Sequence, residues 1–250
     1  MKKENSLEFE VYGDYALFSD PVTRVGGEKN SYFVPTYEAL KGILHSIYWK
    51  PTIIWIVDKV KVLKPIKTES KSIRTMKYND SSECDRSFYT YLKDVRYAVK
   101  AHFIWNENRP ELEKDRIEDK HYFMAKRALE RGGRRDIFLG TRECSGYVKP
   151  CDFETAKSFY EYDSEPIDFG NMFHGITYPD EAFLPEDKDY MTVRFWHCKM
   201  KNGIIEFPEP NSLEKKRHIR KMSMKKFGLD ENLKNVEEEI DLLNQGKEGG

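Results

Sequence analysis

The order in which strand-like and helix-like patterns follow one another constrains this chain most. Strands are indicated by alternating apolar and polar side chains or by runs of Val and Ile, and helices by apolar side chains three and four residues apart. These patterns follow in the order strand, helix, strand, strand, helix, strand, at Leu7–Tyr12, 35–51, Thr52–Val62, Tyr89–Trp105, Asp115–Arg131 and Ser145–Val148. This order predicts an α+β chain whose first part has a ferredoxin-like fold, in which two helices cover one face of a sheet.

Local signals set the limits of the two predicted helices. The first has Pro35 near its start, and Pro51 stops it. The second ends at the Gly132-Gly133 pair, which supplies the left-handed conformation that closes many helices. We expect Phe123 and Leu129, together with Ala128, to face the core from the second helix.

The remaining sequence divides the chain into three parts. Residues 1–152 form the ferredoxin-like domain, interrupted by a basic insertion at about 64–86, and residues 153–226 form a small antiparallel β-rich unit. Within that unit the turn Lys201-Asn202-Gly203 predicts a hairpin between Met191–Cys198 and Ile204–Phe207. Residues 227–250 form a charged tail or helix.

Charge is separated along the chain although the net charge is only −1. Basic side chains dominate residues 59–77 and 215–226, whereas 152–189 is acidic. This separation predicts one face that meets a polyanion, with a merely solvated surface as the alternative. Tyrosines in or near the basic segments add rings that could stack on unpaired bases.

The cysteines argue for a reduced, metal-free protein. Cys84, Cys144, Cys151 and Cys198 follow no disulfide framework, and their spacing from each other and from histidines matches no zinc motif. No apolar run reaches the ~20 residues that span a bilayer, and the N-terminus lacks a secretory pattern. We therefore expect a cytoplasmic chain without a membrane segment, a metal or another cofactor.

One group of side chains could catalyse proton transfer. Lys120 and His121 lie near the start of the second helix, and Tyr48 lies at the end of the first, where side-by-side helices would bring it close. An imidazole, a phenol and an ammonium group can supply the acid, the base and the cation that RNA cleavage needs without a metal. The alternative is a surface histidine, a solvated lysine and a tyrosine that packs in the core.

Two glycine-containing loops could approach phosphates. Arg24–Lys29 and Arg131–Asp136 each combine paired glycines with basic side chains. Neither matches a Walker A loop or a dinucleotide fingerprint, so nucleotide hydrolysis is not expected. A helix entry and a helix C-cap are the structural alternatives.

Several of these segments together resemble a known family. The chain is similar to the Cas-five subunit of type I-C (Dvulg) CRISPR systems, in the RAMP superfamily, over most of its length. The resemblance is carried by Gly13–Phe18, Arg24–Lys29, Val34–Gly42, Ser46–Pro51, Gly132–Gly140 and Glu143–Tyr147.

The resemblance implies an endoribonuclease that cuts CRISPR precursor RNA at the base of the repeat hairpin by 2′-hydroxyl attack. It implies that Tyr48, Lys120 and His121 carry catalysis. We assign RNA binding to Arg24, Lys29, Arg134, Arg135 and the basic segment 59–77.

The same resemblance implies the partners. They are the repeat hairpin RNA, the mature crRNA held by its 5′ handle, and the backbone and large subunits of a type I-C effector complex. One alternative is a scaffold that caps the 5′ handle without cutting. Another is a general RNA- or DNA-binding protein, and duplex DNA binding by the basic segment could accompany either.

Overall fold

The first part of the chain forms an antiparallel sheet with two helices. The computed structural model describes residues 5–23, 28–76, 84–117, 119–163 and 165–224. Four strands pair antiparallel in the order β3-β5-β1-β7. The elements are β1 (Ser6–Ala16), α1 (Tyr37–Ile47), β3 (Ile53–Val62), β5 (Cys84–Trp105), α2 (Lys120–Glu130) and β7 (Ser145–Pro150). The predicted strand and helix order and the α+β, ferredoxin-like fold are therefore confirmed.

Three short strands extend this sheet. β10 (Ile204–Glu206) pairs with β3 at one edge, and β6 (Ile137–Phe138) pairs with β7 at the other. β2 (Lys29–Asn30) runs parallel to part of β5. The sheet therefore includes residues from both ends of the described chain.

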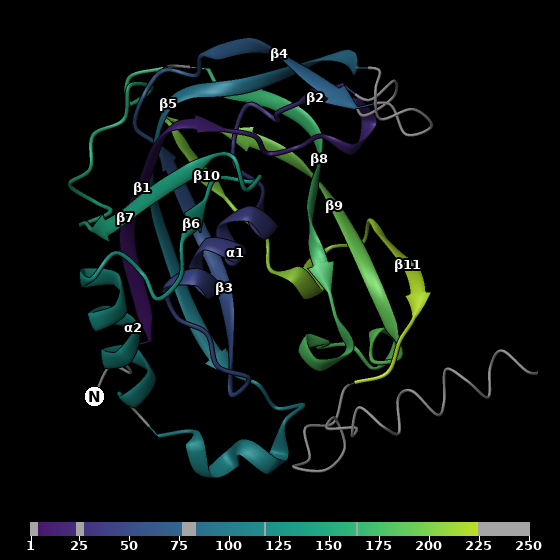
Figure 1. Cartoon of the computed structure of the whole chain (residues 1–250). Coiled ribbons are helices and arrows are strands. Elements are labelled where there is room, and N and C mark those ends of the chain that lie inside the picture. The colour runs from purple at the N-terminus through teal and green to yellow at the C-terminus, as the bar shows by residue number, and fades with distance from the viewer. Residues whose placement is uncertain (1–4, 24–27, 77–83, 118, 164, 225–250) are drawn as a thin grey trace, which may run out of the picture.

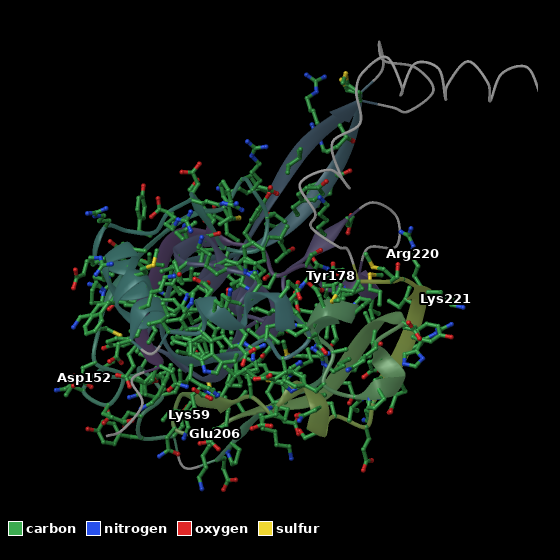
Figure 2. The ribbon with its side chains drawn as sticks, turned by 90° about the horizontal axis from the view of Figure 1, so that it is seen from below. Lys59, Asp152, Tyr178, Glu206, Arg220 and Lys221 are labelled. Atoms are coloured by element: carbon green, nitrogen blue, oxygen red, sulfur yellow. The ribbon has the colours of Figure 1, made fainter. Side chains whose placement is uncertain are left out.

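The basic insertion is a β-hairpin arm. β4 (Thr68–Met76) pairs antiparallel with the first part of β5, from Thr68 opposite Leu92 to Met76 opposite Cys84. Exposed and half-buried side chains alternate along β4, as expected for a two-stranded ribbon outside the core. Figure 2 shows this arm projecting away from the body of the molecule.

Helix α1 begins and ends as its sequence predicts. The Thr36 side chain accepts a hydrogen bond from the Ala39 amide, which caps the first turn. Leu40 and Leu44 are buried on the inner face, and the backbone becomes extended at Tyr48. The helix therefore ends with Tyr48 held against the core.

Helix α2 is shorter than predicted. It starts at Lys120, after Asp119 in the left-handed conformation (φ 62°), and the preceding residues form the 3-10 helix η2 (Pro110–Asp115). His121 and Leu129 face the core, but Phe123 is 46% exposed, so its predicted inward position is wrong. It lies on the opposite side of the helix from the buried positions 121, 125, 128 and 129.

A second sheet lies beyond residue 164. It contains β8 (Ile167–Thr177), β9 (Tyr190–Met200) and β11 (Lys216–Lys221), paired antiparallel in the order β11-β9-β8. Three single-turn 3-10 helices lie in its loops, η3 (Pro179–Glu181), η4 (Pro185–Asp187) and η5 (Pro210–Ser212). No helix in the described ranges is long and apolar enough to cross a membrane.

The predicted hairpin after β9 is only partly correct. Asn202 and Gly203 do adopt positive φ values, 52° and 76°, and Lys201 bridges Ile204 across the turn. The strand that follows, however, pairs with β3 and not with β9. Ile205 is completely buried there, so pairing with β3 places its side chain in the core. The predicted tail from 227 to 250 lies outside the described residues.

Helix α1 joins the two sheets. It lies between the first sheet and the β8–β9 pair (Figure 1), and it contacts both β3 and β8. The Tyr37 ring stacks on His174 of β8, with ring centroids 4.2 Å apart. The Glu38 carboxylate accepts a hydrogen bond from the Ile176 amide at 2.9 Å. The apolar core is therefore continuous through α1.

Part of the sheet face opposite the helices is covered as well. The Lys61 ammonium donates to the carbonyl oxygens of Phe153 and Ala156 at 2.6 and 2.9 Å, and the Phe153 side chain is buried. This segment covers the β3 side of the face.

Candidate functional site

Two of the predicted catalytic side chains meet where α1 ends and α2 begins. The Tyr48 hydroxyl oxygen lies 2.9 Å from His121 Nδ1. Tyr48 is held in place by its own amide, which donates to the Leu44 carbonyl, and by the Trp55 indole, which donates to the Tyr48 carbonyl at 2.8 Å. His121 is the second residue of α2. The side-by-side helices therefore bring together residues 73 positions apart.

The hydrogen bonds of His121 define how its ring is protonated when neutral. Nε2 lies 2.9 Å from the backbone carbonyl oxygen of Asp115, which can only accept a hydrogen bond. Nε2 therefore carries the proton, and Nδ1 accepts the proton of the Tyr48 hydroxyl. The Trp105 and Phe103 rings pack edge-on against the imidazole, with centroids 5.6 and 6.3 Å away.

Both rings are enclosed. His121 has no exposed surface and Tyr48 is 1% exposed. Burial, with the nearby Asp115 carboxylate adding to it, raises the pKa of Tyr48 to about 12, although the charge of Arg134 opposes this shift. Tyr48 therefore remains a phenol, able to donate a proton, throughout the neutral range.

Asp115 links the third predicted catalytic residue to this pair. Its carboxylate forms an ion pair with the Lys120 ammonium and accepts a hydrogen bond of 2.6 Å from the Thr52 hydroxyl. These two hydrogen bonds, Lys120 first, lower the pKa of Asp115. Neither Asp115 nor Thr52 was predicted from the sequence as part of the site. No motif marks them, because they lie 6 and 69 positions before His121 and are joined to it only by the fold.

Arg134 and Arg135 lie beside this group. Their backbone amides both donate to the Ser46 carbonyl oxygen, at 3.0 and 3.1 Å, near the end of α1. Gly133, with φ 103°, allows the chain to turn there after α2. Both arginine side chains are exposed. They therefore lie at the surface next to the buried Tyr48.

The other two predicted RNA-binding residues are not part of this group. Lys29 lies on β2, where its ammonium sits over the Tyr89 ring of β5, 4.8 Å from the centroid. Figure 1 shows β2 near the β4–β5 arm, at the opposite end of the sheet from α2. Arg24 lies outside the described residues. Lys29 thus belongs with the arm and not with the Tyr48–His121 pair.

The side chains available in this region suit proton transfer. Among the described residues, no three His, Cys, Asp or Glu side chains are grouped as ligands of a metal ion would be. The site contains an imidazole, a phenol, a carboxylate and an ammonium group. These can donate and accept protons and stabilise negative charge.

The fold and these side chains place the chain among ferredoxin-like proteins with a candidate acid–base site between their helices. The model of the Cas5d branch of the CRISPR-associated proteins (Cas_Cas5) matches residues 6–208. The chain belongs to this CRISPR-associated protein family.

Two named relatives support this assignment. A protein of Mannheimia succiniciproducens called CRISPR pre-crRNA endoribonuclease Cas5d is 29% identical over 238 residues, which cover 85% of this chain and 99% of that protein. A protein of the same name from Thermus thermophilus is 28% identical over 222 residues, 81% of this chain and 91% of that protein.

Solved structures share the fold. A crystal structure of a CRISPR-associated protein superposes with a TM-score of 0.70 at 37% identity, covering 87% of this chain and 98% of that one. A functionally uncharacterized protein from Streptococcus mutans gives the same TM-score at 38% identity, covering 87% and 99% of the two chains.

Proposed function

We propose that this chain is a metal-independent endoribonuclease that cleaves CRISPR precursor RNA at the base of the repeat hairpin. The observation that carries the proposal is the Tyr48–His121 hydrogen bond beside Lys120, in a chain of the Cas5d family. The names of the two relatives give the substrate class. We further propose that the product stays bound by its 5′ handle, and that the chain joins the other subunits of a type I-C effector complex.

The reaction needs two proton transfers. The 2′-hydroxyl oxygen attacks phosphorus and loses its proton to a base, while the bond from phosphorus to the 5′ oxygen breaks and that oxygen gains a proton from an acid. A 2′,3′-cyclic phosphate and a 5′-hydroxyl result. His121 and Tyr48 share the acid and base roles, and Lys120 stabilises the negative charge on the phosphate oxygens.

The enclosure of His121 adds a step to this proposal. Because the ring has no exposed surface, neither nitrogen can reach an RNA atom while Asp115 holds Nε2. We infer that RNA binding displaces the segment that contains Asp115 and frees Lys120 for the phosphate. The Lys120 side chain is 39% exposed, which supports the proposal that Lys120 is the first of these groups to contact the RNA.

The enclosure also keeps a second candidate function open. A scaffold that binds the 5′ handle without cutting would need no access to Tyr48 and His121, and would use Arg134, Arg135 and the arm alone. In that case the Tyr48–His121 pair would only stabilise the packing of the two helices.

Cleavage of the repeat RNA by purified protein in excess EDTA separates these candidates. We expect the wild type to cut and His121→Ala, which removes a proton-transfer group, to lose at least about a hundredfold in rate. Lys120→Gln, which removes the charge that stabilises the phosphate oxygens, should lose about as much. The Lys120 side chain is 39% exposed, so we expect this variant to keep the fold. The matched control is His197→Ala, which removes an exposed histidine on β9. This variant should cut RNA at the wild-type rate.

A second substrate tests the chemistry itself. RNA with a 2′-deoxy nucleotide before the cut should bind with unchanged affinity but should not be cleaved. Persistent cleavage would exclude the internal nucleophile. Tight RNA binding without cleavage by the wild type would instead identify the chain as a scaffold.

A further inference from the structure

A pair of tyrosines, one exposed and one half-buried, lies on the sheet face opposite the helices. Tyr12 of β1 and Tyr147 of β7 are register partners, with ring centroids 5.7 Å apart and an interplanar angle of 33°. Tyr147 is 63% exposed. Tyr12 alternates along β1 with Val11, which is buried under the helices, so its own side chain points to the other face. The exposed Tyr147 ring therefore packs beside the half-buried Tyr12 ring across two strands.

Two cations flank the Tyr12 ring. The Arg96 guanidinium lies over the Tyr12 ring at 5.3 Å from the centroid, and the Lys149 ammonium at 5.5 Å. Both also lie near the Glu10 carboxylate, at 3.2 and 3.3 Å. The Glu10 carboxylate holds both cations beside the Tyr12 ring, and a net positive charge remains among these three groups.

The described residues leave this part of the face open. The segment that contains Phe153 covers Lys61 and the β3 side, whereas Tyr147 remains exposed on β7. β7 also adjoins the candidate catalytic region, because its Gly146 pairs with Ile137, which follows Arg135 by two residues. A strand of RNA that contacts Arg134 and Arg135 could therefore continue onto Tyr147.

We infer that Tyr147, backed by Tyr12, is a stacking site for an unpaired nucleobase of single-stranded RNA, with Arg96 and Lys149 facing the adjoining phosphates. Aromatic rings on an open sheet face with neighbouring basic groups are the usual means of holding unpaired bases. This inference rests on the proposed function for its ligand, but it concerns binding and not the chemical step.

Binding of a labelled oligouridylate of about ten nucleotides tests the site, since single-stranded sites of this kind span about 4–16 nucleotides. Tyr147→Ala loses the stacking contact with one base, so we expect this variant to bind the RNA about tenfold more weakly than the wild type. Tyr147→Phe keeps the ring and should bind within about twofold of the wild type. The control is Tyr178→Ala, which removes an exposed tyrosine after β8.

Photocrosslinking locates the base directly. With 5-iodouridine in the same RNA, we expect the crosslinked peptide to contain Tyr147 or Tyr12. Unchanged affinity in Tyr147→Ala, or crosslinks only at other peptides, would overturn the inference. A crosslink at Tyr147 in a protein that binds but never cuts repeat RNA would support the stacking site and refute the proposed nuclease.

Discussion

The Thr52 hydroxyl shows how a residue without chemistry of its own can organise the candidate site. Thr52 is 1% exposed, and its hydroxyl donates a hydrogen bond to the Asp115 carboxylate. The backbone carbonyl of Asp115 in turn accepts a hydrogen bond from His121 Nε2. A hydrogen bond to a charged group contributes about 1.5–3 kcal/mol. Thr52 therefore acts on the His121 ring through Asp115, as a positioning residue.

Replacing this hydroxyl should slow cleavage without weakening RNA binding. Thr52→Val keeps the volume but removes the donor, and we expect a roughly tenfold lower rate at saturating RNA, equal to about 1.4 kcal/mol. Single-turnover cleavage gives the rate and fluorescence anisotropy gives the dissociation constant. Thr52→Ser, which restores the donor, should recover most of the rate. Equal rates for all three proteins would show that Asp115 needs no such support.

Among the elements, the β4–β5 arm contributes surface and little core. Arg74 and Arg86 face each other across its two strands, and both are exposed. Like charges directly opposite one another destabilise a strand pair. Both guanidinium groups nevertheless lie on the exposed arm, where they can contact the phosphates of a polyanion.

Neutralising this pair should reduce the salt dependence of RNA binding. If each arginine contacts one phosphate of a single strand, Arg74→Gln with Arg86→Gln should lower the slope of log affinity against log salt by about 1.4. Binding measured from low to moderate salt gives this slope, and the position of the cut should not move. An unchanged slope would mean that the arm does not contact RNA phosphates.

At the scale of the whole molecule, the two predicted domains share one core. We propose that the division at residues 152 and 153 separates two structural units that do not fold independently. β10 completes the first sheet, and Ile205, Phe207 and Trp196 belong to the same buried cluster as Phe9. Removing these side chains would expose the apolar surfaces of β3 and α1.

A fragment of residues 1–152 should therefore lack a cooperative unfolding transition. Circular dichroism during heating measures this, with a fragment of residues 1–226 as the control that keeps both sheets. A sharp transition in the shorter fragment would show that the ferredoxin-like unit is stable alone.

Burial of His174 between the units should make the stability of the chain depend on pH. Burial, with Arg194 nearby, lowers the pKa of His174 to about 3, far below its ordinary value of 6.5. Between these values the unfolded chain binds a proton that the folded chain does not, so stability falls as the pH drops below 6.5.

At pH 5.5 this single group should cost about 1.4 kcal/mol relative to pH 7.5. Denaturant unfolding at both pH values measures the loss for the wild type and for His174→Gln, which cannot take up this proton. We expect the loss to be smaller in the variant by about that amount. An equal loss in both proteins would contradict a neutral buried His174.

The local patterns of the sequence were sufficient to predict the main elements. Alternation along Leu7–Tyr12 and Tyr89–Trp105, the proline limits of α1 and the glycine pair after α2 all correspond to the structure, because hydrophobic periodicity and backbone restrictions act over a few residues. The position of Tyr48 at the end of α1 was also predictable from its sequence.

Only the tertiary structure decided what these elements meet. The outward position of Phe123, the pairing of β10 with β3, and the contacts of Thr52 and Asp115 with the Lys120–His121 region depend on packing between residues far apart in sequence. The exposure of Tyr147 and the burial of His174 also depend on which residues pack over them in the folded chain. A local pattern fixes which way a side chain points from its own strand or helix, but burial and hydrogen bonding depend on which other element lies there.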